Sequence, residues 1–283
     1  MTTLATLIQQ VPPHYKANTT AMWFFTVWAG GMAIVVLPYV IKKLRAGDSI
    51  PMYVWFGGFI CSLCEPMLDH LGHLWWPHNL PGPAFSGYDL NVPWLIPPCY
   101  VFFVAMTGYW VYTKMVSGLR VKHVFMVFAL AAGRDMILEY PGLSLHVYKY
   151  YGHVPTRIGP FPWFWAWTNG AAMMMVGFLL YLAVPHLKGR LRPYALLIPI
   201  CGFMTAYGIA GTPYFMALNW SFPRGIQWLL AAWSFCMAFL IVRVIAFVVT
   251  TRTPNTISQL GWGDDGPPPE PVADHSLLQL IKL

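Results

Sequence analysis

The sequence predicts an all-α integral membrane protein, a bundle of seven transmembrane helices with its N-terminus outside and its C-terminus in the cytoplasm. Three observations predict this fold: the composition, the apolar segments and the placement of the basic residues. Hydrophobic residues make up 57% of the 283 residues and charged residues only 10%. So few charges cannot cover the surface of an ordinary water-soluble protein, so the composition places the chain in the membrane class.

Apolar segments long enough to cross a bilayer recur along the chain. A transmembrane helix needs roughly 20 mainly apolar residues. The segments that meet this length are 21–41, 52–76, 94–116, 123–146, 161–185, 194–218 and 224–250. We therefore expect seven spans.

Basic residues concentrate in every other connection between these segments. Those on the first side are Lys42, Lys43, Arg45, Lys114, Arg120, Lys122, Lys188, Arg190, Arg192 and Arg252. The opposite side carries only Lys16, Lys149, Arg157 and Arg224. Because cytoplasmic loops carry the excess of Lys and Arg, this bias predicts the orientation. We interpret the net charge of +7 as this topology signal, with no nucleic-acid partner.

The predicted organisation has three parts. Residues 1–20 form an outer N-terminal segment, and residues 21–252 form the seven-helix domain embedded in the lipid bilayer. Residues 253–283 are polar and rich in proline, which is typical of a flexible tail, here a cytoplasmic one that could dock a protein partner. The protein is accordingly expected in the cell membrane as a multi-pass protein.

Acidic side chains occur in the second segment, where they are costly. Glu65, Asp69 and His73 are spaced four residues apart, so on one continuous helix they share a face. An ionisable group in the hydrocarbon region costs at least about 2.5–3.5 kcal/mol, so such residues face an interior, a partner or a cavity. This stripe is the first candidate site.

The fourth segment, which runs in the same direction, repeats the pattern. Asp135 and Glu139 are again four residues apart, beside Arg134, at a depth similar to that of Glu65 and Asp69. If the two helices face each other, these residues share a cavity in the outer half of the bundle. The structural alternative is an ion pair between Arg134 and one carboxylate that pins the helices together.

This set of residues favours general acid/base chemistry. A protonated carboxylic acid beside an ionised one can donate and accept protons. We expect Glu65 or Asp69 to donate a proton and Glu139 or Asp135 to accept one. Arg134 is expected to make the pKa values of the donating and accepting carboxyl groups differ. The substrate is expected to be hydrophobic and to bind within the bundle, and no cofactor is required.

Two other hypotheses stay open. Carboxylate and imidazole groups at i, i+4 spacings on two helices also suit a divalent metal, held by Glu65, Asp69, His73, Asp135 and Glu139, in a membrane oxidoreductase. Alternatively, the chain is a non-catalytic subunit of a membrane complex whose buried charges relay protons or hold partners.

Further polar and aromatic residues lie in other segments. The polar residues interpreted as interhelical hydrogen-bonding groups are Thr107, Tyr109, Asn169, Thr205, Tyr207, Thr212 and Tyr214. Trp163, Trp165 and Trp167 are interpreted as an interfacial aromatic belt, with the lining of a pocket as the alternative.

Two stretches carry a family resemblance. The Glu-Pro-x-x-Asp-x-x-Gly pattern of Glu65–Gly72, a loop rich in Pro, Gly and aromatics, and ILEYPGLSLHVYKYYGHVP (Ile137–Pro155) together resemble the AveC-like spirocyclase family. The resemblance covers about residues 56–160. It implies a multi-span protein of a bacterial inner membrane that closes a spiroketal on a polyketide, with dehydration as a related activity and without a redox cofactor.

The sequence therefore leads to one main hypothesis. The chain is expected to be a membrane enzyme, a lyase or isomerase resembling a spirocyclase or cyclase-dehydratase. It would catalyse the cyclisation, dehydration or isomerisation of a polyketide-like or isoprenoid-like substrate, with Glu65, Asp69, His73, Arg134, Asp135 and Glu139 as catalytic candidates.

Overall fold

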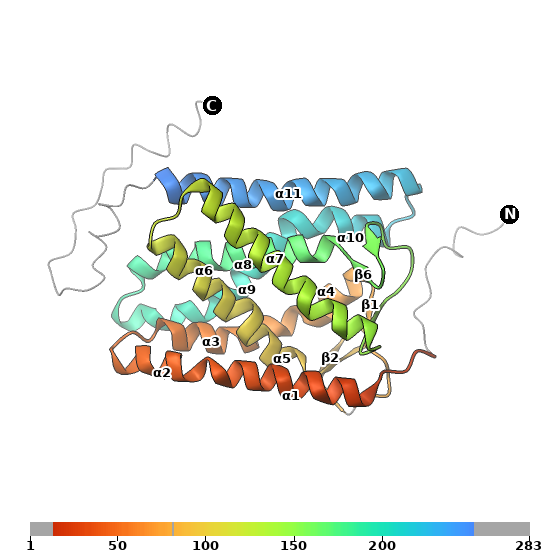
Figure 1. The fold of residues 1–283 in the computed structure, drawn as a ribbon, viewed down its shortest axis with the longest axis horizontal. Coiled ribbons are helices and arrows are strands. Elements are labelled where there is room, and N and C mark those ends of the chain that lie inside the picture. Colours follow the sequence, from red (N-terminus) through yellow and green to blue (C-terminus); the bar gives the residue numbers. More distant parts are fainter. Residues whose placement is uncertain (1–13, 81, 252–283) are drawn as a thin grey trace.

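The computed structural model describes residues 14–80 and 82–251, and this part of the chain is mostly helical. Consecutive helical elements join end to end into rods that lie side by side (Figure 1). The helical elements are α1 (Thr19–Val35), α2 (Leu37–Arg45), α3 (Ile50–Cys61), η2 (Ser62–Cys64), α4 (Glu65–Gly72), α5 (Ile96–Cys99), η3 (Tyr100–Ala105), α6 (Met106–Val116), α7 (Val121–Ser144), α8 (Phe164–Ala183), η4 (Val184–His186), η5 (Gly189–Leu197), α9 (Ile198–Ala206), η6 (Tyr207–Gly211), α10 (Thr212–Asn219) and α11 (Arg224–Thr251).

Each of the seven predicted apolar segments coincides with one rod. In order, the rods are α1–α2, α3–η2–α4, α5–η3–α6, α7, α8–η4, η5–α9–η6–α10 and α11. Within the described residues, four of them are long and apolar enough to cross a membrane, which indicates a membrane protein: Thr19–Arg45, Phe164–His186, Gly189–Asn219 and Arg224–Thr251. The second and fourth rods, which are not among these four, carry the four acidic residues singled out above.

Local sequence explains how several helices begin and end. The Asn18 side chain caps α1, since its Oδ1 accepts a hydrogen bond of 3.1 Å from the Ala21 amide. Basic residues in the last turn of α2 complement the partial negative charge at the C-terminus of that helix. Pro66, which suits the first turn of a helix, lies at the start of α4 directly after the 3₁₀ turn η2. The second rod is thus interrupted immediately before Glu65.

Two short stretches are π-helical. These are η3 and η6, which begin at Tyr100 and Tyr207 respectively. A π-helical turn holds one more residue than an α-helical turn, and such turns often occur at functional sites. Both tyrosines point into the centre of the bundle, as described below.

Three short antiparallel strand pairs lie at one end of the bundle, which we call the strand-bearing end (Figure 1). The strands are β1 (Leu74–Trp75), β2 (Pro83–Gly87), β3 (Leu90–Pro93), β4 (Lys149–Tyr150), β5 (Arg157–Ile158) and β6 (Phe161–Pro162). Strand β1 pairs with β4, with Leu74 opposite Tyr150 and Trp75 opposite Lys149. This pair connects the loop after α4 to the loop after α7.

The opposite half of the bundle is closely packed around small residues. A Cβ atom added at Gly108 of α6 would come within 2.3 Å of the Val176 side chain in α8, and one at Gly177 within 2.9 Å of the Gly108 carbonyl oxygen. A Cβ at Gly202 of α9 would come within 2.7 Å of the Val176 backbone. Glycine therefore allows three helices to approach closely here, as is common between membrane helices.

The two predicted terminal segments are largely outside the described residues. The predicted cytoplasmic tail, 253–283, lies entirely outside them, as do residues 1–13. The chain just before α1 is held at the strand-bearing end, because Ala17 and Asn79 exchange two hydrogen bonds of 2.8 and 3.0 Å.

Candidate active site

All four acidic residues predicted on the second and fourth segments line one cavity. Glu65 and Asp69 enter it from α4, and Asp135 and Glu139 enter it from α7. The centre of a water-sized molecule can reach about 120 Å³ inside it. One water needs roughly 10–15 Å³ by this measure, so the cavity is large enough for a small ligand.

The rest of the cavity wall is mainly apolar and aromatic. Its side chains come from α1, α4, α5, α7, α8, α9, both π-helical segments and the loops joined by β1 and β4. The lining residues besides the four acids are Phe25, Trp28, Leu68, Gly72, Leu74, Trp76, Leu95, Ile96, Cys99, Tyr100, Phe103, Val104, Leu138, Gly142, Val147, Tyr148, Tyr150, Trp165, Asn169, Phe203 and Tyr207. Such a wall suits a ligand with a large hydrophobic surface.

The two carboxyl groups of α4 are buried and hydrogen-bonded. Glu65 is 9% exposed, and its Oε2 accepts a hydrogen bond of 2.5 Å from the Tyr100 hydroxyl. Asp69 is 5% exposed, and its Oδ2 accepts a hydrogen bond of 2.6 Å from Nε1 of Trp76. Each donor comes from another element, since Tyr100 begins η3 and Trp76 follows β1.

Asp135 lies at one end of a buried hydrogen-bond chain. Its Oδ1 accepts a bond of 2.9 Å from Nδ2 of Asn169 in α8. The Asn169 Oδ1 in turn accepts a bond of 2.5 Å from the Tyr207 hydroxyl. The expectation that Asn169 and Tyr207 form interhelical hydrogen bonds is therefore correct, and the bonds they form support a cavity carboxylate.

Glu139 receives its donors from the loop after α7. Its Oε2 accepts hydrogen bonds of 2.6 Å from the Tyr148 hydroxyl and 3.4 Å from the Tyr150 hydroxyl. Burial, and secondly the nearby Glu139 carboxyl, raise the pKa of both tyrosines well above the ordinary value for this side chain. Both hydroxyls therefore stay protonated and remain hydrogen-bond donors to Glu139.

The cluster has carboxyl groups but no counter-charge at the wall. Among the described residues that line the cavity, none is lysine, arginine or histidine. Every donor to a carboxyl oxygen is a neutral hydroxyl, amide or indole group. Glu139 is close enough to interact electrostatically with Glu65, Asp69 and Asp135. Four carboxyl groups arranged in this way cannot all be ionised without a large free-energy cost.

The helices α4 and α7 share the cavity but have little direct contact with each other. Helix α7 packs mainly on α8, and α4 packs on α10 and the nearby loops. The cavity itself fills the space between the two acidic pairs, and the β1–β4 pairing joins the helix ends beyond it. The two acidic pairs thus line one cavity, and the paired strands β1 and β4 connect the loops that follow their helices.

Among the described residues, Arg134 does not form the ion pair with a carboxylate that the sequence offered as the structural alternative. Its guanidinium donates to the Thr107 hydroxyl and, over 3.3 Å, to the Phe102 carbonyl. It lies 5.4 Å from the ring centres of both Phe102 and Phe103, so it is held by cation–π contacts as well. Residue 134 lies on a different face of α7 from residues 135 and 139, so Arg134 does not line the cavity. Its side chain instead contacts the third rod, α5–η3–α6.

His73 does not continue the helical stripe of Glu65 and Asp69. Helix α4 ends at Gly72, and His73 adopts a left-handed conformation with φ 56°. Its ring stacks on Tyr151 at a centroid distance of 4.8 Å, and its Nε2 lies 3.3 Å from Oδ1 of Asn219. The i, i+4 argument fails here because the helix stops one residue early.

The predicted metal set is not assembled. In the ranges 14–80 and 82–251, no three His, Cys, Asp or Glu side chains are grouped so that they could hold a metal ion. His73 is not part of the cavity wall, and one oxygen of each carboxyl group accepts a hydrogen bond from a neutral donor.

Several residues of the site were not identified from the sequence. The donors Trp76, Tyr100, Tyr148 and Tyr150 are ordinary aromatic residues in an aromatic-rich chain, and no spacing distinguishes them. Trp165 was expected in an interfacial belt, but it is 4% exposed and lines the cavity, which is the alternative use. Trp163 is 39% exposed.

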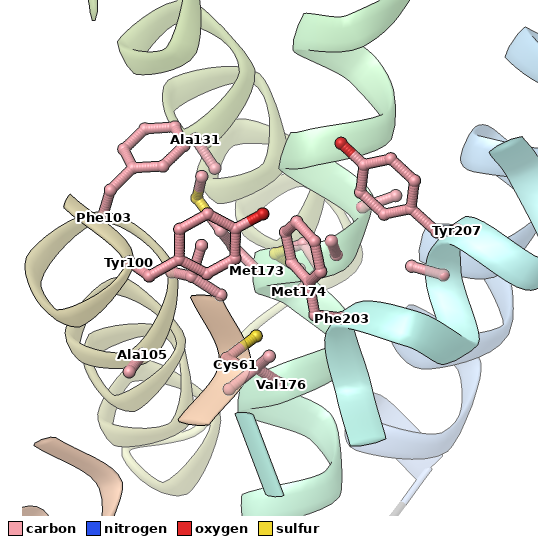
Figure 2. Close-up of a cluster of buried hydrophobic side chains, with 14 of the residues drawn as sticks. Cys61, Tyr100, Phe103, Ala105, Ala131, Met173, Met174, Val176, Phe203 and Tyr207 are labelled. Atoms are coloured by element: carbon pink, nitrogen blue, oxygen red, sulfur yellow. The ribbon is translucent and has the colours of Figure 1, made fainter. Parts of the chain in front are cut away.

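Part of the cavity wall is formed by aromatic residues of the buried core (Figure 2). Phe203 lies between Tyr100 and Tyr207, at centroid distances of 5.3 and 4.6 Å. Beside them lie Met173 and Met174 of α8, both fully buried. The two tyrosines therefore have their rings in the core, while their hydroxyl groups bond the polar cluster.

The fold and the site together define a helical protein with membrane-type helices around an acidic and aromatic cavity. Comparison of the chain with protein-family models, curated proteins and solved structures gave no match. The function is therefore inferred from the residues that line the cavity.

Proposed function

We propose that this protein is a multi-pass membrane enzyme that binds a hydrophobic small molecule in the acidic cavity and transforms it by proton transfer. The reaction class is cyclisation, dehydration or isomerisation. In such reactions an acid protonates an oxygen or a double bond and a base removes a proton elsewhere. The net change is a rearrangement of bonds or the loss of one water, so no redox cofactor is needed.

One observation carries the proposal: four carboxyl groups from two helices line a single cavity and have only neutral hydrogen-bond donors. Since the ionised forms repel one another in a poorly solvated site, the cluster retains protons while some members are ionised. A site that holds both forms is able to donate and to accept a proton. We assign donation to Glu65 or Asp69 and acceptance to Glu139 or Asp135.

The family resemblance supports the same reaction class. The two stretches that resemble AveC-like spirocyclases, 65–72 and 137–155, supply Glu65, Asp69 and Glu139 together with the donors Tyr148 and Tyr150. They come together at the cavity although 64 residues, 73–136, separate them. A polyketide-like or isoprenoid-like substrate fits both the resemblance and the apolar wall.

The proposal includes the membrane arrangement. All seven rods would span the bilayer of a bacterial inner membrane, with the strand-bearing end and the N-terminus outside. The supporting observations are the basic connections at the other end and the attachment of Ala17 to Asn79 at the strand-bearing end. The orientation is tested with cysteines introduced singly at two exposed positions, 89 between β2 and β3 and 188 between η4 and η5, and labelled from outside intact cells by a charged maleimide. Only position 89 should react.

The function is tested by comparing lipid extracts of cells that produce the wild-type chain with extracts of cells that produce Glu65→Gln, Asp69→Asn or Glu139→Gln. Each variant keeps the shape of its side chain but cannot exchange the carboxyl proton. The matched control is Asp89→Asn, an exposed acid in the loop between β2 and β3. Products that appear with wild type and with the control, and disappear with the three variants, are expected.

Retention of these products in all three correctly folded variants would refute the proposal. Loss of the products when a chelator is added, with stoichiometric metal in the purified protein, would favour a metal-dependent oxidoreductase instead. Isolation of the chain in a stable complex in which another subunit carries the activity would favour a non-catalytic role.

A further inference from the structure

Two buried polar atoms in the cavity wall have no hydrogen-bond partner among the described residues. One is Oδ2 of Asp135, and the other is Nε1 of Trp165. The two residues are only 1% and 4% exposed. A buried polar group without a partner costs roughly 1–3 kcal/mol, so such atoms at the wall of a cavity indicate where a ligand presents a polar group.

The two atoms belong to one small polar region within the aromatic wall. Asp135 is bonded through Asn169 to Tyr207, and the Trp165 ring stacks on Tyr207 at a centroid distance of 5.8 Å. Trp165 and Asn169 are four residues apart on α8, so they face the same side of that helix. The region therefore offers one acceptor and one donor to whatever occupies the cavity.

The rotation of Trp165 is restricted by its neighbours. A Cβ atom at Gly72 would come within 2.6 Å of the Trp165 ring, and the ring also stacks on Tyr150 at 6.3 Å. The indole is thus packed on the side of α4 and on the side of the loop that contains β4. The indole ring, with its unpartnered N–H, is consequently held in place at the cavity wall.

We propose that Asp135 and Trp165 form a hydroxyl-binding subsite, so that the cavity takes a hydrophobic alcohol and positions its hydroxyl group. A hydroxyl group can accept from Nε1 of Trp165 and can also bond Oδ2 of Asp135 as donor or acceptor. A hydrocarbon leaves both atoms without partners. An ammonium group cannot accept from the indole, and an anionic ligand meets four carboxyl groups.

This inference rests on the proposed function only in the choice of cavity, because it concerns binding and requires no turnover. In a dehydration or cyclisation, the bound hydroxyl would be the oxygen that leaves or attacks. Measuring binding separately from product formation keeps the two proposals distinguishable. Glu65→Gln should abolish turnover and leave the preference for an alcohol intact.

The experiment measures ligand retention by the purified full-length protein in lipid nanodiscs, with empty nanodiscs subtracted. Two probe pairs differ only in the hydroxyl group: farnesol with farnesene, and borneol with bornane. We expect at least one alcohol to be retained in preference to its hydrocarbon. Trp165→Phe, which keeps an aromatic ring but removes the N–H, should reduce this preference by roughly 3- to 10-fold, the effect of one hydrogen bond.

The chain offers matched controls. Trp167 lies on the same helix and also has an unpartnered Nε1 within the described residues, but it does not line the cavity. Trp167→Phe should leave the preference unchanged. Asp135→Leu should reduce it, whereas Asp48→Asn, a change at a carboxylate far from the cavity wall, should not. Thermal unfolding of each variant without ligand establishes that it is folded.

Equal retention of alcohol and hydrocarbon in both probe pairs would overturn the proposal. So would a preference that Trp165→Phe and Trp167→Phe reduce to the same extent. A preference that disappears only with Trp165→Phe and Asp135→Leu would support it.

Discussion

The two halves of this bundle differ in how they use small and acidic residues. In the half away from the strands, Gly108, Gly177 and Gly202 bring three helices into contact and leave no space. In the half toward the strands, acidic and aromatic residues surround a cavity in which the centre of a water-sized molecule can reach about 120 Å³. The comparison shows that the buried acids accompany an open interior and that the closely packed half holds the bundle together without them.

The largest effect is expected from the acids of the cavity half. Glu139→Gln should lower product formation by about 100- to 10,000-fold, because loss of a general acid or base removes that factor. Product formation in lipid extracts at equal protein level provides the measurement. If Glu139→Gln kept full activity, Glu139 would not take part in the reaction, and its place in the cavity would have no catalytic meaning.

The next effect concerns the closely packed half. Gly108→Ala should destabilise the fold by about 1–3 kcal/mol, since its Cβ would overlap Val176 and the helices would have to separate. Thermal unfolding in detergent measures this loss. Gly30→Ala is the control, because a Cβ there meets nothing within 4 Å. Equal stability of the two variants would contradict the close packing described here.

A smaller effect should follow from removing a donor in the cavity half. Tyr148→Phe leaves Glu139 with the longer bond from Tyr150, and activity should fall by roughly 2- to 10-fold, as for one hydrogen bond. Tyr140→Phe, which removes an exposed hydroxyl bonded to the Ile158 carbonyl, is the matched control. A Tyr148→Phe variant that matches this control would exclude Tyr148 from positioning Glu139.

The smallest effect is expected at Arg134, which belongs structurally to the contact between α7 and the third rod. Arg134→Lys loses the planar contacts with Phe102 and Phe103 and should reduce stability by about 0.5–1 kcal/mol. The shape of the pH–activity profile should stay that of wild type. A shifted profile would restore Arg134 to the role in proton affinity that the sequence predicts for it.

The helical rods could be predicted from the sequence because their signal is local. Apolar segments of about 20 residues, separated by basic connections, coincide with helical rods throughout the described residues. The grouping of Glu65, Asp69, Asp135 and Glu139 was also predictable, because the cost of a buried charge requires such residues to face an interior. The two acidic pairs also lie at similar positions along their helices, so they were expected at the same depth in the bundle.

Other features depend on contacts that a single sequence does not reveal. Arg134 was assigned to the carboxylates by charge, but a hydroxyl, a carbonyl and two aromatic rings satisfy it. His73 was assigned to the stripe by spacing, but the helix ends at Gly72. The donors to the carboxyl groups come from distant segments, and the π-helical turns that place Tyr100 and Tyr207 have no sequence pattern of their own.

The β1–β4 pair makes the width of the cavity depend on loop length. Leu74 and Tyr150 are paired just beyond the ends of the two acid-bearing helices, which have little direct contact with each other. Inserting or deleting a residue between α7 and β4 would therefore move Tyr148 and Tyr150, which line the cavity, while α7 keeps its packing on α8. Variation of this loop would thus change the size and shape of the molecule that the cavity can hold.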